Sequence, residues 1–290
     1  MLTRRSFSQL LPSLLIAAVG LACAPAMVPA QAPASVGAPY RILVSNDDGV
    51  RAPGILAVAQ ALRALGEVTI VAPAENQSGK GHSITIYEPI FRDEVVLAGG
   101  LKATSLTATP ASTVKVALAN IVSEKPHLVV SGINRGSNLG LSAYVSGTAG
   151  AAREAASAGI PAIASSLAMP ATDYAAAAEA TLRVARHVKE HGLPAGVFLN
   201  VNVPTGTAQA LKGLVITSQA MASGGRESFA EQKHPNGRTL YWNVYEEGGS
   251  GPEGSDVWAV AQGYVSVTPM KVLEYDAEVA ARLKPLAARQ

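Results

Sequence analysis

Between residues 40 and 204, short apolar runs alternate with segments of helical periodicity. The apolar runs are not interrupted by polar residues, which is typical of strands that are buried on both faces of a sheet. A single helical segment separates each run from the next, which is the pattern of βαβ units. The sequence therefore predicts a doubly wound α/β core, with a mostly parallel sheet covered by helices on both faces.

Turn and capping residues mark the boundaries of the individual elements. Pro is common at the start of a helix, and Gly is common directly after its end. The predicted strands are 41–45, 68–72, 127–131, 161–165 and 197–203. The predicted helices are 53–65, 110–123, 148–158 and a long helix that Thr172 caps and Gly192 ends.

The chain becomes polar and rich in Gly after Pro204. Residues 205–255 are too long for a simple connection, so we expect strands or a hairpin that projects from the core, with 223–237 as a mobile arm. Residues 258–268 are expected to form a returning strand, and 272–286 a closing helix. The predicted division is a signal (1–32), a linker (33–39), a core (40–204) and a C-terminal arm with its returning strand and helix (205–290).

The first 32 residues have the features of a secretory signal. Arg4 and Arg5 precede an apolar run that leads to Ala30 and Ala32, a small-x-small cleavage pattern. The paired arginines resemble a twin-arginine signal, whose machinery exports folded proteins. The run is short and interrupted by prolines, which argues against a membrane anchor. We expect a periplasmic protein without stable membrane association once the signal is removed.

Cysteine content and charge limit the possible partners of the mature chain. The single cysteine, Cys23, lies in the predicted signal, so no disulfide is expected. Lys and Arg number 23, and removal of the two in the signal leaves 21 against 21 acidic residues. A neutral protein lacks the basic surface that nucleic-acid polymers require. Small molecules are therefore the expected ligands.

Adjacent acidic residues follow the first predicted strand, in the segment Ser45-Asn46-Asp47-Asp48-Gly49. In open α/β sheets, ligands bind beyond the carboxyl ends of the strands. Two neighbouring carboxylates resist ionising together unless a cation lies beside them, and hard oxygen ligands suit Mg²⁺ or Mn²⁺. The alternative is an ordinary solvated turn, since Asn, Asp and Gly are all common turn residues.

Two further loops leave strands at the same edge. The Gly-rich segment 72–83 can bring backbone N–H groups close to a phosphate, although its spacing is not that of a P-loop. After the strand 127–131, Asn134 offers a neutral oxygen to a hard cation. Ser146, Gly147 and Thr148 then open a helix, whose first N–H groups form a ready anion site. Simple N-capping by Ser146 or Thr148 is the alternative interpretation.

With these motifs, the chain resembles the SurE family of metal-dependent 5′/3′-nucleotidases. The resemblance is carried, in order along the chain, by Ile42–Ile55, Val71–Gly81, Thr109–Leu118, Pro126–Gly136, Ser146–Ala152 and Gly263–Pro269. It implies a Rossmann-like core and a C-terminal arm that exchanges between subunits. It also implies one divalent cation per subunit, Mg²⁺ or Mn²⁺, held by residues that match Asp47, Asp48, Ser78 and Asn134.

The resemblance also implies an activity. We expect a phosphoric monoester hydrolase that acts on nucleoside monophosphates, with other phosphomonoesters or polyphosphate as further substrates. Asp47 and Asp48 are the expected catalytic residues, and the enzyme is expected to form a homodimer or homotetramer. The residues expected to bind the phosphate or the substrate are Asn46, Gly79, Ser146, Gly147 and Thr148.

Two rival functions share parts of this pattern. A non-catalytic periplasmic nucleotide-binding protein has the same fold and anion loops, but does not need two carboxylates beside a phosphate. A dinucleotide oxidoreductase needs Gly-x-Gly-x-x-Gly after its first strand, and this chain has Asn-Asp-Asp-Gly there. The acidic pair therefore favours the hydrolase.

Overall fold

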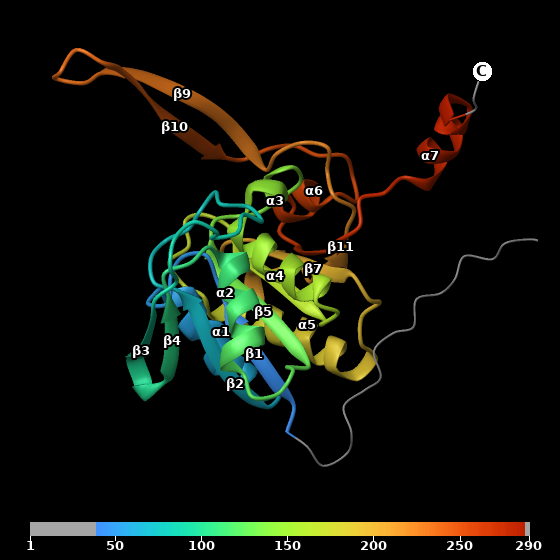
Figure 1. Cartoon of the computed structure of the whole chain (residues 1–290). Helices are drawn as coiled ribbons and strands as arrows, with labels where there is room; N and C mark the ends of the chain where they lie inside the picture. Colours follow the sequence, from blue (N-terminus) through green and yellow to red (C-terminus); the bar gives the residue numbers. More distant parts are fainter. Residues whose placement is uncertain (1–38, 288–290) are drawn as a thin grey trace, which may run out of the picture.

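The computed structural model describes residues 39–287 of the chain (Figure 1). Predictions that concern the signal (1–32) and the linker up to residue 38 lie outside the described residues. No helix in the described part is both long and apolar enough to cross a membrane.

A nine-stranded sheet forms the centre of the described structure. In spatial order the strands are β3 (Arg92–Val96), β4 (Lys102–Leu106), β2 (Glu67–Pro73), β1 (Arg41–Ser45), β5 (Leu128–Arg135), β6 (Ala162–Leu167), β7 (Val197–Val203), β11 (Val265–Lys271) and β8 (Leu214–Ile216). In this order, the strands from β4 to β7 all run parallel to their neighbours, while β3 is antiparallel to β4, and β11 is antiparallel to β7 but parallel to β8. This confirms the predicted doubly wound, mostly parallel sheet.

Helices cover both faces of this sheet. The helices α1 and α5 pack on one face, where they meet Ile42 and Val44 of β1, and α2 and α4 pack on the other, where they meet Leu43. Successive residues of β1 thus point to opposite apolar layers, which explains the uninterrupted apolar run. The helices of these layers are α1 (Pro53–Leu62), α2 (Pro110–Val116), α4 (Gly147–Ser157) and α5 (Ala175–His191).

Shorter elements complete the body. The helix α2 continues directly into a π-helical turn, and α3 immediately precedes α4. Their bounds, with those of the 3₁₀ turns, are Ala117–Ile121 for the π-helical turn, Ser142–Val145 for α3, and Ala98–Gly100, Ala208–Ala210 and Lys284–Ala287 for the 3₁₀ turns.

Several predicted boundaries inside the core are wrong, and two of them have a clear cause or a clear replacement. The strand β5 does not end at Ser131 but continues to Arg135 through a register shift against β6. Gly132 makes this possible, because its φ of 135° and its approach to the Ser165 carbonyl exclude a side chain. The second boundary is the start of α5, where Tyr174 and not Thr172 occupies the N-cap position.

The C-terminal part differs more from the prediction. The single strand expected over 258–268 is wrong: a short helix, α6 (Asp256–Ala261), precedes β11. The Ser255 hydroxyl caps this helix by accepting a bond from the Trp258 N–H, and Gly263, at a φ of 85°, separates helix from strand. The closing helix α7 spans only Ala277–Leu283.

A long two-stranded hairpin projects from the body (Figure 1). It consists of β9 (Gly225–Lys233) and β10 (Thr239–Glu247), paired antiparallel over their full lengths. The expected hairpin extension is therefore confirmed. Residues beyond 204 also supply β8 and β11 to the central sheet, so this segment serves the core as well as the hairpin.

Candidate active site

The loop after β1 places Asp47 in the interior and Asp48 beside it. Asp47 is only 3% exposed, and its Oδ1 accepts a 2.5 Å hydrogen bond from the Thr148 hydroxyl. Asp48 is half-buried, and its Oδ2 accepts from the Arg135 N–H at 2.9 Å. A Cβ at Gly147 would lie 2.8 Å from the Asp47 Cβ, so only glycine allows α4 to approach this closely. Both carboxylates are held in defined orientations.

Burial makes ionisation of this acidic pair costly. It raises the pKa of Asp47 to about 6, against the opposing effect of the Thr148 hydroxyl and with a further increase from neighbouring Asp48. Burial also raises the pKa of Asp48, while the N–H and the charge of Arg135 oppose this increase. A cation between or beside the carboxylates would favour their charged forms.

The loop after β2 lies against the acidic loop and against α4. The Gln77 N–H donates to the Asp47 carbonyl at 2.7 Å, and the Gly81 N–H donates to the Val145 carbonyl at 2.9 Å. Between these two anchors lie Ser78 and Gly79, both exposed to the cleft that contains Asp47. The Ser78 oxygen is thereby available to a ligand.

At the end of β5, Asn134 is almost completely buried, with 8% exposure. Its amide nitrogen donates to the Gly136 carbonyl at 2.7 Å, which turns its Oδ1 away from that carbonyl and leaves the oxygen as an acceptor. The extension of β5 brings this residue to the edge of the sheet where Asp47 and Asp48 lie. The prediction that these groups converge there is consistent with this geometry.

Of the two alternatives that the sequence left for the first turn of α4, N-capping is observed. The Ser146 hydroxyl accepts from the Ala149 N–H at 3.1 Å, so it caps the helix, and Ser146 also lines the cleft. Thr148 and Gly147 are fully buried beneath Asp47. Asn46 is buried too and donates to the Gly49 carbonyl at 2.8 Å, so its side chain shapes the loop away from the cleft.

One cleft of about 820 Å³ brings the principal predicted residues together. Asp47, Asp48, Ser78 and Asn134 all line it, as do Gly79 and Ser146. The oxygen donors, two of them carboxylates, are of the type that hard divalent cations prefer. No group of three His, Cys, Asp or Glu side chains suited to a metal occurs among residues 39–287, so the remaining donors are neutral.

Comparison with known proteins identifies the family. The model of the family "Survival protein SurE" matches residues 42–225, which include every predicted site residue. This chain belongs to the SurE family. Among the relatives, "5′-nucleotidase SurE" of Geobacter sulfurreducens is 45% identical over 79% of this chain and 87% of its own length. "5′-nucleotidase SurE 1" of Thermus thermophilus is 45% identical over 80% of this chain and 92% of its own length.

A solved structure supports the same assignment. The chain resembles the SurE protein of Aquifex aeolicus with a TM-score of 0.75 and 36% sequence identity. The match covers 86% of this chain and all of that chain. It therefore extends over nearly the whole described part, including elements beyond the SurE family match.

Sequence reasoning missed a buried polar network behind the acidic pair. The Asn138 amide donates to Ser166 Oγ at 2.9 Å and, more weakly, to Thr148 Oγ1 at 3.5 Å. Asn200 and Asn202 of β7 both donate to the Asn138 carbonyl. Two Asn residues at alternate positions of an apolar strand were the available signal, because such residues are seldom fully buried without a specific partner.

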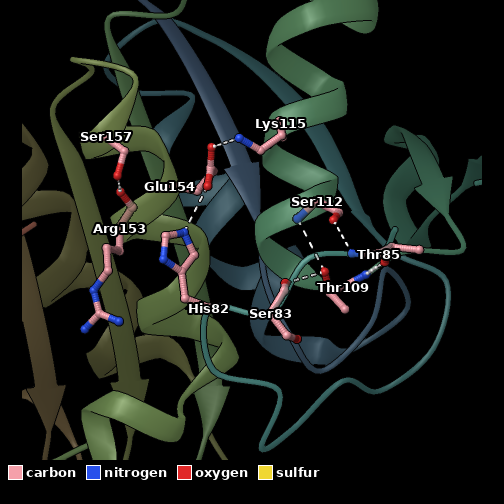
Figure 2. Close-up of polar contacts among 9 residues, drawn as sticks. All are labelled: His82, Ser83, Thr85, Thr109, Ser112, Lys115, Arg153, Glu154 and Ser157. Atoms are coloured by element: carbon pink, nitrogen blue, oxygen red, sulfur yellow. Dashed lines mark hydrogen bonds and ion pairs between the residues drawn. The ribbon is translucent and has the colours of Figure 1, made fainter. Parts of the chain in front are cut away.

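Figure 2 shows a second supporting network, on the outer side of α4. Glu154 accepts from His82 at 2.9 Å and from Lys115 at 2.7 Å. These two partners, His82 first, hold the pKa of Glu154 below its ordinary value. The His82 ring thereby secures the loop after Ser78 to α4.

Proposed function

We propose that this SurE-family chain is a metal-dependent 5′-nucleotidase that hydrolyses nucleoside monophosphates to nucleoside and phosphate. The observation that carries the proposal is the shared cleft in which Asp47 and Asp48 meet Ser78 and Asn134 at the start of α4. The names of the relatives point to the same substrate class. A purely nucleotide-binding protein would not need two carboxylates, the buried Asp47 and the half-buried Asp48, where it binds a phosphate.

In this proposal Asp47, Asp48, Ser78 and Asn134 hold one divalent cation, with Mg²⁺ or Mn²⁺ as the expected ion. When bound, such a cation neutralises phosphoryl oxygens and lowers the pKa of a coordinated water. The described residues fit this role, because desolvation disfavours a charged Asp47 in the absence of a compensating positive charge. The amide oxygen of Asn134 and the hydroxyl of Ser78 add donors without further negative charge.

The protein residues position and stabilise the reacting phosphate. The positive end of the α4 dipole lies at Ser146 and Gly147, beside the cleft, where it would stabilise negative charge that develops in the transition state. Thr148 and the Arg135 N–H each occupy one oxygen of the acidic pair, which keeps both carboxylates in place as ligands. This arrangement favours water over either aspartate as the nucleophile.

The proposal extends to assembly and location. The hairpin leaves Phe229, Tyr241 and Trp242 exposed by 64%, 62% and 60% respectively. Because an isolated two-stranded hairpin is marginally stable, coverage by a second copy of the chain supports a homodimer or homotetramer. The predicted signal supports export to the periplasm, where other phosphomonoesters or polyphosphate are further candidate substrates.

Phosphate release from nucleoside monophosphates tests the function directly. The mature chain is assayed after EDTA treatment and again after addition of Mg²⁺ or Mn²⁺. We expect hydrolysis that is lost with EDTA and restored by the metal. Hydrolysis that persists unchanged in metal-depleted buffer would contradict the metal dependence, and the absence of hydrolysis with every metal would contradict the enzymatic function.

A further inference from the structure

The base of the β9–β10 hairpin is fixed to the rim of the cleft that holds the acidic pair. The Glu247 carboxylate accepts from the Ser137 N–H at 2.6 Å and from the Met169 N–H at 2.7 Å. Gly136 lies so close that an added Cβ would be 3.3 Å from Glu247 Oε1. The Ser137 and Met169 N–H groups lie directly after β5 and β6, at the sheet edge that carries the site. Their bonds to the Glu247 carboxylate therefore set the position of the hairpin relative to the site.

The connections at the hairpin base reinforce this position. Gly140 forms a β-bridge with Ser223, just before β9. The fully buried Asp256 carboxylate accepts from the N–H groups of Gly140 at 2.7 Å and Ala220 at 3.0 Å. After β10, the Gly248 N–H donates to the Gly224 carbonyl. The hairpin is thus tied to the loop that follows β5, the strand that carries the predicted ligand Asn134.

One face of the hairpin forms a wall of the cleft. The register pairs Tyr245 with Glu227. Alternate residues of a strand share a face, so Asn243, Tyr245 and Glu247 lie on the same side of the hairpin as Glu227. All four line the cleft that contains Asp47. Its volume of about 820 Å³ is in the range of small-molecule sites.

The chemistry of this wall differs from that of the acidic end. The Tyr245 ring packs over Gly225, where an added Cβ would lie 2.7 Å from Tyr245 Cζ, yet the residue remains 44% exposed. Glu227 Oε1 accepts from the Asn243 amide, which leaves Glu227 Oε2 and Asn243 Oδ1 as acceptors. An aromatic face beside hydrogen-bond acceptors suits a nucleobase, which presents a flat ring and N–H donors.

We propose that this face of the hairpin is the nucleobase subsite, in which Tyr245 stacks on the base and Glu227 accepts hydrogen bonds from it. This inference rests on the proposed function. The SurE family match ends at residue 225, where β9 begins, so that match does not itself specify the wall. The negative charge of Glu227 also opposes binding of the phosphate here, whereas a cation held by Asp47 and Asp48 would attract it to the other end of the cleft.

The subsite has a preferred ligand. Guanine presents its N1–H and N2–H groups side by side, two donors for the two remaining acceptors, Glu227 Oε2 and Asn243 Oδ1, whereas the same edge of adenine presents one donor, its exocyclic amino group. The subsite therefore favours guanosine monophosphate over adenosine monophosphate.

The test compares kcat/KM for guanosine monophosphate, adenosine monophosphate and glycerol 2-phosphate, which has no base. We expect Tyr245→Ala to lower the values for both nucleotides by about tenfold or more, with glycerol 2-phosphate unchanged and with activity retained in Tyr245→Phe. Glu227→Gln, a milder surface change, should reduce the preference for guanosine monophosphate by about fivefold or more. Equal losses on all three substrates in Tyr245→Ala, or an unchanged preference in Glu227→Gln, would overturn the subsite.

Calorimetric binding of guanosine separates this proposal from the proposed function, because guanosine has no phosphate to hydrolyse. Binding to the mature protein that weakens in Tyr245→Ala supports the subsite even if no hydrolysis occurs. Hydrolysis of nucleotides by a protein that binds guanosine equally well with and without Tyr245 would reject the subsite and leave the nucleotidase in place.

Discussion

The hydrogen bond from Thr148 to Asp47 offers a sharp test of how the acidic pair is held. Thr148 is fully buried, and its hydroxyl donates to Asp47 Oδ1 at 2.5 Å. The substitution Thr148→Val keeps the shape of the side chain and removes this donor. The matched control, Thr148→Ser, keeps the hydroxyl and removes a methyl group. The pair thus separates loss of the hydrogen bond from changes in packing.

The expected size of the effect follows from the nature of the bond. A hydrogen bond to a charged group contributes about 1.5–3 kcal/mol. Since about 1.4 kcal/mol corresponds to a tenfold change in an equilibrium constant, the Val variant should bind its metal roughly 10- to 100-fold more weakly. Substitution of residues that orient metal ligands has effects of the same order, about 10–100-fold.

The measurement is a metal titration of phosphate release, paired with calorimetric metal binding, for the wild type and both variants. We expect the half-saturating metal concentration to rise in Thr148→Val and to stay within about threefold of wild type in Thr148→Ser. Thermal unfolding of the three proteins checks that each is folded. Wild-type metal affinity in the folded Val variant would refute the reasoning, because Asp47 would then not depend on Thr148.

Four other outcomes are expected. Asp47→Asn or Asp48→Asn should lower hydrolysis at least about tenfold together with metal affinity; unchanged rates in metal-buffered assays of both variants would contradict the metal site. Glu154→Gln should lower the free energy of unfolding by roughly 1–3 kcal/mol at neutral pH. The lowered pKa of Glu154 means that this stabilisation is present above its ordinary pKa and is lost as the pH falls through the folded value, so denaturant unfolding should show the difference from wild type shrinking in acid. Replacement of Arg4 and Arg5 by Lys should block export in a periplasmic fractionation; normal export without the twin-arginine machinery would favour the general secretory route. Replacement of residues 223–237 by a short Gly-Ser linker should shift the protein toward monomer in light scattering, and a wild-type monomer at micromolar concentration would end the assembly model.

The part of the site that sequence reasoning predicted lies directly after parallel strands. Asp47, Ser78 and Asn134 share one cleft because the carboxyl ends of β1, β2 and β5 meet at one edge of the sheet. The extension of β5 to Arg135 was not predictable in the same way. It depends on Gly132 passing close to the Ser165 carbonyl, a contact between strands that are adjacent in space only after folding.

Residues whose role depends on long-range docking gave weaker signals. The polar network of Asn138 joins residues more than 60 positions apart, and its members look like isolated Asn residues along the chain. Residues 258–268 read as one apolar strand because the helix α6 is only six residues long, too short to establish a helical period. The hairpin itself was predictable as an arm, but the docking of its base on the cleft was not.

This docking gives the hairpin two different faces. The face with Tyr245 and Glu227 lines the cleft near the base, whereas Phe229 and Tyr241 farther along this face are exposed, as is Trp242 on the opposite face. A two-stranded ribbon has no core of its own, so contacts at its base and along its exposed outer part must both contribute to its order. If a second copy of the chain covers the outer part, assembly and nucleobase binding depend on the same two strands. The proposed specificity of the enzyme is then coupled to its oligomeric state, whereas the acidic pair, set on the rigid sheet edge, is not.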